Sequence, residues 1–170
     1  MGKPTRNPKK VKTVRIKIPW IGEVEWGEDP TERNAAWRLY IELVTRIAVQ
    51  PLAADQGLLR EALSSLHELF AATRETLKQA GPDVGASTGS VGGIAIAVLN
   101  RGLRPFLAKW HSRLADWEPQ RDPRTGAGHH ERQWAEYSQM RAELEALRVN
   151  LELYAQVLAT IAGVTIQVNN

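Results

Sequence analysis

The sequence predicts a mainly α protein, a four-helix bundle with a small β-hairpin or sheet formed by N- and C-terminal strands. Apolar residues recur at spacings of three and four in four long stretches, which is typical of helices that pack in a bundle. Near both chain ends, apolar and polar residues alternate, as they do in strands with one buried face. The chain has 170 residues, 43% of them hydrophobic, which is enough for one core.

The strands are predicted on either side of the turn at residues 19–22 and again near the C-terminus. Alternating residues around that turn predict a β-hairpin over residues 11–27, and the same pattern predicts a C-terminal strand over 164–168. An isolated hairpin is marginally stable in water. We therefore expect the C-terminal strand to join the hairpin, which would bring the two chain ends together.

Four helices are expected between the strands. Asp29 and Pro30 have the chemistry of a helix start, and Pro51 and Gly81-Pro82 end the first two helices. Pro105 falls inside the third helix and should bend it, whereas Gly92, Gly93 and Gly102 should let that helix approach a neighbour closely. The clearest heptad pattern lies in the last helix, at Tyr137, Met140, Leu144, Leu147, Leu151, Tyr154, Leu158 and Ile161. The expected helices cover about residues 30–50, 57–80, 91–118 and 129–162.

The composition excludes several classes of protein. The chain has no cysteine, so it has no disulfide, thiolate metal site or cysteine nucleophile. Its most apolar run, Val91 to Leu99, is far shorter than the roughly 20 residues of a membrane span. We therefore expect a soluble, cytoplasmic, single-domain protein over residues 11–170, without a transmembrane segment and without a cofactor.

The positive charge is concentrated at the N-terminus. The net charge is +3, yet the first 17 residues carry seven lysines and arginines and no acid, which leaves the rest at −4. We predict that residues 1–10 form a basic, flexible arm. Lys9, Lys10 and Lys12 are candidate contacts to nucleic-acid phosphates, through non-specific and salt-dependent attraction. The alternative is a tail that only keeps the protein in solution.

Candidate catalytic residues lie in the third helix, where residues 100–111 gather cations, an amide and an imidazole around Pro105. Arg104 and His111 are two helical turns apart on one face. This arginine–histidine pattern resembles the HEPN ribonucleases, which are also helical bundles. The resemblance implies metal-independent cleavage of RNA, with His111 in acid–base work. HEPN sequences usually have a polar residue directly after the arginine, where this chain has Pro105. The alternative is a solvated helix face, because both residues fall outside the heptad pattern.

Residues that could bind a metal are present at two places in the chain. His129, His130 and Glu131 stand together, with His67 and Glu68 elsewhere, but no second ligand pair has a recognisable spacing. We therefore expect no metal.

Aromatic residues indicate an interaction surface. The chain has six tryptophans, and tryptophan often anchors interfaces. Trp20, Trp26 and Trp37, together with Ile166 on the expected C-terminal strand, are the candidate interaction residues. The alternative is that these tryptophans form the joint between the sheet and the bundle.

Most of the chain, from about Val14 to Gly163, also resembles an uncharacterised family of small bacterial proteins. The resemblance implies a link to bacterial conflict or defence systems and assigns no functional residue. It rests on four segments: residues 18–23, residues 36–37 with 42–47, residues 57–66 and residues 103–111.

The sequence as a whole favours a non-enzymatic module that self-associates, or binds a protein partner encoded elsewhere, through the sheet edge and the tryptophans. Two alternatives stay open: RNA cleavage by Arg104 and His111, and nucleic-acid binding by the basic arm.

Overall fold

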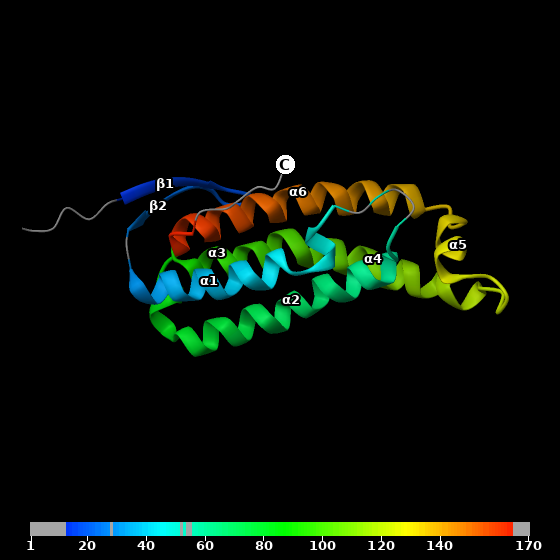
Figure 1. Ribbon diagram of the computed structural model, residues 1–170, viewed down its shortest axis with the longest axis horizontal. Coiled ribbons are helices and arrows are strands. Elements are labelled where there is room, and N and C mark those ends of the chain that lie inside the picture. The colour runs from blue at the N-terminus through cyan, green and yellow to red at the C-terminus, as the bar shows by residue number, and fades with distance from the viewer. Residues whose placement is uncertain (1–12, 28, 52, 54–55, 165–170) are drawn as a thin grey trace, which may run out of the picture.

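Four long helices pack side by side in the computed structural model (Figure 1), which describes residues 13–27, 29–51, 53 and 56–164. Successive long helices run in opposite directions, and the first also contacts the last, so the four enclose one core. The prediction of a mainly α, four-helix protein is confirmed. The long helices are α1 (Pro30–Val44), α2 (Leu59–Ala80), α4 (Arg104–Trp117) and α6 (Tyr137–Ala162).

The described sheet is an N-terminal hairpin. Strands β1 (Thr13–Ile18) and β2 (Gly22–Gly27) pair antiparallel, and β1 lies against α6. The predicted sheet built from both chain ends is therefore wrong for the described residues. Val164, where the C-terminal strand was expected to start, instead donates its backbone N–H to the carbonyl of Ala159 at 2.9 Å and so caps α6. The rest of the expected strand, residues 165–168, lies outside the described residues.

The third predicted helix is continuous but changes its winding. It comprises α3 (Val91–Ala97), a π-helical segment η3 (Val98–Leu103) and α4. Pro105 is the second residue of α4, and only Arg104 separates it from the π-helical segment. A wider π turn removes the need for the backbone hydrogen bond that proline cannot donate. Where a bend was predicted at Pro105, the described helix changes from π to α type.

The first predicted helix ends earlier than residue 50. α1 stops at Val44, where the Thr45 side chain donates a hydrogen bond to the Ile41 carbonyl at 2.7 Å. A 3₁₀ turn, η1 (Ile47–Val49), follows and buries Ala48 and Val49. Further 3₁₀ turns are η2 (Pro82–Gly85), after α2, and η4 (Glu118–Gln120), after α4.

The last predicted helix, residues 129–162, is two helices. A short α5 (Ala127–Arg132) precedes α6, and the chain turns between them. Trp134 lies in that turn and is buried, with its ring edge-on to the ring of Trp110 at 5.9 Å between centroids. A continuous helix was the wrong prediction because the chain breaks where Trp134 enters the core.

Glycines let the α3–α4 segment approach its neighbours, as predicted. A side-chain Cβ at Gly93 would lie 2.1 Å from the carbonyl oxygen of Ser87, and one at Gly102 would lie 2.9 Å from the ring of Trp20. Trp20 itself has a positive φ of 64° in the hairpin turn, and its carbonyl accepts a hydrogen bond from Arg101. The hairpin turn therefore docks on the π-helical segment, at a position that only glycine leaves open.

Within the described residues, one stretch, Val91–Gln120, is long and apolar enough to cross a membrane by length and composition alone. Of the most apolar 18 consecutive residues in this stretch, 56% are buried inside the protein. Large side chains of this stretch, such as Trp110 and Leu114, are fully covered by the other helices. That is the pattern of a core helix.

Candidate functional site

The candidate histidine lies in a polar cluster between α2 and α4. His111 of α4 lies beside Arg60 of α2, with 3.1 Å between the histidine Nδ1 and an arginine amino group. The His67 ring stands edge-on to the His111 ring at 5.8 Å between centroids. Arg60 also binds Glu118 with two hydrogen bonds, of 2.7 and 2.8 Å. The cluster therefore contains two imidazoles and an arginine whose charge is matched by a carboxylate.

This environment favours the neutral form of His111. Burial lowers the pKa of His111 first, the positive charge of Arg60 and the nearby His67 lower it further, and Glu118 acts in the opposite direction. A neutral imidazole that accepts from Arg60 at Nδ1 carries its proton on Nε2. That Nε2 is buried and has no hydrogen-bond partner in the described part of the chain.

Arg104 does not complete the expected pair with His111. Its Nε donates to Asn100 at 3.1 Å, and its guanidinium lies over the Phe70 ring, 5.6 Å from the centroid. The cation that touches His111 is Arg60, and the sequence analysis missed it. A signal was present, since Arg60 and His67 are seven residues apart on α2, as Arg104 and His111 are on α4.

The histidines before α6 have structural contacts. His130 stacks on Trp117 with 4.6 Å between ring centroids, and the two residues exchange side-chain-to-carbonyl hydrogen bonds. The buried Glu131 carboxylate accepts the backbone N–H groups of Leu59 and Arg60 at the start of α2. No group of three or more potential metal ligands occurs among the described residues.

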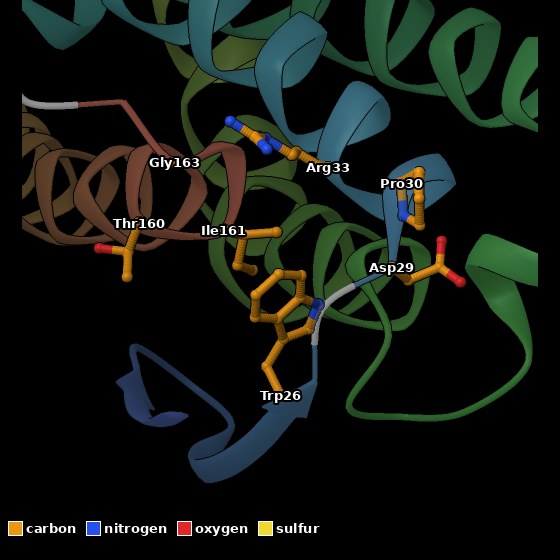
Figure 2. A pocket seen from close by; sticks show the side chains of 7 residues that line it. All are labelled: Trp26, Asp29, Pro30, Arg33, Thr160, Ile161 and Gly163. Atoms are coloured by element: carbon orange, nitrogen blue, oxygen red, sulfur yellow. The ribbon is translucent and has the colours of Figure 1, made fainter. Parts of the chain in front are cut away.

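Two of the candidate interaction tryptophans belong to the joint between hairpin and bundle. Trp26 is buried, and its Nε1 donates to Glu32 of α1 at 2.6 Å. Figure 2 shows Trp26 beside Ile161 and the start of α1, around a hollow of about 290 Å³. Arg33, on the same hollow, donates to the Ala162 carbonyl at 2.8 Å and holds α1 to the end of α6. Trp20 is half-buried on Gly102.

Trp37 is the candidate tryptophan that remains open to solvent. It is 45% exposed on α1 and stacks on Tyr40 with 5.8 Å between ring centroids. Ile41, one turn further along α1, is 38% exposed. Two surface hollows, of about 450 and 380 Å³, run along the α1–α2 junction and share Trp37, Arg38 and Gln79 in their walls. We call the surface formed by Trp37, Arg38, Ile41 and Glu42 the α1 face.

The other candidate contacts cannot be placed. Lys9, Lys10, Lys12 and Ile166 lie outside the described residues. Comparison with family models, curated proteins and solved structures gives no match for this chain. Function is therefore inferred from the chain's own surfaces.

Proposed function

We propose that this protein is a non-enzymatic, self-associating helical interaction module. The observation that carries the proposal is the exposure of Trp37 and Ile41 next to each other on α1. Each is a large apolar side chain, and α1 has other apolar residues, Leu39 and Leu43, that are almost completely buried in the core. α1 therefore presents apolar side chains on two sides, one of which the bundle does not cover.

Such an exposed pair supplies an anchor for binding. Burying apolar surface is worth roughly 25 cal/mol per Å², and tryptophan is enriched among residues whose loss costs the most binding energy. The hollows beside Trp37 give the surface a concave shape that flat, fully solvated helix faces lack. Polar side chains such as Arg38 and Gln79 border it, as at the rims of protein interfaces.

The test is the molar mass in solution as a function of concentration, by light scattering coupled to size-exclusion chromatography. We expect a species larger than the 18.9 kDa monomer. Ile41→Ser should shift the equilibrium towards the monomer, because it removes exposed apolar area from the α1 face. Ile96→Ser is the matched control, since Ile96 is 48% exposed on α3. A wild-type monomer at all concentrations would refute self-association.

A second candidate is metal-independent RNA cleavage at His111. It is supported by one observation, the buried and unpartnered Nε2 of a neutral imidazole beside Arg60. In this tautomer Nε2 carries the proton, so the candidate role of His111 is to donate towards a phosphate or leaving oxygen, and not to accept a proton from a ribose hydroxyl. The ion pair between Arg60 and Glu118 counts against RNA cleavage, because the carboxylate neutralises the charge that would otherwise attract a phosphate. The test is cleavage of RNA in the presence of a chelator, which His111→Ala should abolish without unfolding the protein; no cleavage by the wild type would exclude this function.

A further inference from the structure

We infer that the occupant of the α1 face is a second copy of this chain, bound with its α1 antiparallel to the first. This inference deepens the proposed self-association and rests on it. Beyond self-association, the inference specifies the surface that the two copies share, the relative direction of the two α1 helices, and the charged residues that pair between the copies.

The order of residues on α1 is self-complementary. Trp37 and Ile41 are four residues apart, and the charged pair Arg38 and Glu42 follows the same spacing one position later. Residues four apart lie on one side of a helix. In an antiparallel pair the order is reversed. With the two-fold axis between residues 39 and 40, Trp37 lies within about 1.5 Å along the helix axis of Ile41 of the second copy, and Arg38 lies within about 1.5 Å of its Glu42. A two-fold axis then repeats every contact, as in closed symmetric dimers.

A parallel arrangement would not satisfy the same residues. With the two helices in register and parallel, Arg38 would face Arg38 and Glu42 would face Glu42. Like charges placed opposite each other across an interface are unfavourable. The charges on the α1 face therefore select the antiparallel arrangement, while the apolar pair supplies most of the binding free energy.

Arg38 and Glu42 are available for such contacts. The hydrogen-bond partner of Arg38 on its own chain is the neutral side chain of Gln79, on α2. Glu42 pairs with Arg46 at 2.7 Å, but Arg46 also binds Glu68 at 2.9 Å, and the Glu42 side chain keeps 41% of its surface exposed. Each residue can thus gain an oppositely charged partner from the second copy without leaving a charge buried.

The hollow on the α2 side of the α1 face could receive the bulky ring of Trp37 from the second copy. It has a volume of about 380 Å³, and its walls include Ile41, Ala72 and Thr76. The acids Glu42 and Glu75 also line it, close to where Arg38 of the second copy would lie. The apolar residues of this hollow suit the ring of the incoming Trp37, and the acids at its border suit the positive charge of the adjacent Arg38.

The test is charge reversal, read out as the dimer dissociation constant by analytical ultracentrifugation. Arg38→Glu and Glu42→Arg should each weaken the dimer by about tenfold or more, because each places like charges opposite each other twice. The variant with both changes should recover an affinity close to the wild type, because the opposite charges are restored. Glu61→Arg, at an exposed position on α2, is the control for a general charge effect.

Cross-linking gives a readout that does not depend on charge. The chain has no cysteine, so Arg38→Cys and Glu42→Cys each introduce a single thiol. A mixture of these two variants should rapidly give the mixed product that joins positions 38 and 42 with a short bis-maleimide, whereas a mixture of Arg38→Cys with Ile96→Cys should give no product that joins positions 38 and 96.

The outcomes separate the two claims. A monomeric wild type would overturn the proposed function and this inference together. A dimer that the single charge reversals leave unchanged, or that the double variant does not recover, would overturn the antiparallel α1 contact and keep self-association. Equal cross-linking in both cysteine mixtures would also overturn it.

Discussion

The carboxylate of Glu131, in α5, accepts a hydrogen bond of 2.9 Å from the backbone N–H of Leu59, the first residue of α2. Its second oxygen accepts from the Arg60 N–H at 3.3 Å. The residue before α2, Leu58, has no side chain that could cap the helix. A residue from a distant part of the chain therefore supplies the N-terminal cap.

We predict that Glu131→Ala lowers the free energy of unfolding by about 2 kcal/mol, because it leaves two backbone N–H groups without an acceptor in a buried place. Glu131→Gln should cost less, because its amide oxygen can still accept one of these bonds. Chemical denaturation monitored by circular dichroism measures both. The control, Glu61→Ala, removes an exposed acid from the first turn of α2 and should change stability by less than about 0.5 kcal/mol. Equal effects of Glu131→Ala and Glu61→Ala would contradict the capping role.

Local signals in the sequence predicted the start of α1 and the end of α2. Asp29 caps α1 by accepting the N–H groups of Thr31 and Glu32, and Gly81 ends α2 with a positive φ of 86°. These features depend on neighbouring residues, so spacing and residue type are sufficient to find them. The cap of α2 could not be found in this way, because Glu131 is 72 positions from Leu59.

Only the α4 side of the cluster around His111 could be predicted from the sequence. The spacing of Arg104 and His111 identified one side of α4. Whether Arg60 and His67 lie next to that side depends on how α2 and α4 are oriented about their own axes. That orientation is set by packing between distant parts of the chain and not by local sequence. The heptad pattern itself begins at Tyr137, the first residue of α6, and the helix start predicted at residue 129 extended beyond that pattern.

The docking of the hairpin on the bundle can be tested at Gly102. Gly102→Ala should reduce the free energy of unfolding by about 1–2 kcal/mol, because its Cβ would lie 2.9 Å from the Trp20 ring. This net loss already includes the gain of roughly 1 kcal/mol that alanine brings to a helix interior. Gly126→Ala is the control, since nothing lies within 4 Å of the Cβ that it would add. In the Gly102→Ala background, Trp20→Leu should cost less than in the wild type, and strictly additive effects would show that the two residues do not touch.

The Tyr154 hydroxyl on α6 is buried and lacks a hydrogen-bond partner in the described structure, and burial raises the pKa of this phenol. Tyr154→Phe should therefore leave the protein as stable as the wild type, or more stable by about 1 kcal/mol, because it removes an unpaired polar group from the core. Tyr137→Phe, at a half-buried position on the same helix, is the comparison. A loss of more than about 1 kcal/mol on Tyr154→Phe would mean that the hydroxyl has a partner.

The stability of the protein should fall on mild acidification because of His111. Its pKa in the folded protein is below the ordinary value of 6.5. As the pH falls through 6.5, the unfolded chain binds a proton at this position before the folded protein does, which favours unfolding. Above about pH 7.5 the imidazole is neutral in both states, and its contribution to the pH dependence disappears.

His111→Gln should remove this part of the pH dependence. The free energy of unfolding of the wild type, measured by urea denaturation between pH 5 and 8, should decrease towards acid pH more steeply than that of the variant, and the two curves should run parallel above about pH 7.5. His129→Gln, at an exposed position on α5, should follow the wild-type curve. Parallel curves for the wild type and His111→Gln across the whole range would mean that His111 titrates alike in the folded and unfolded chains, and that the cluster with Arg60 and His67 does not hold it neutral.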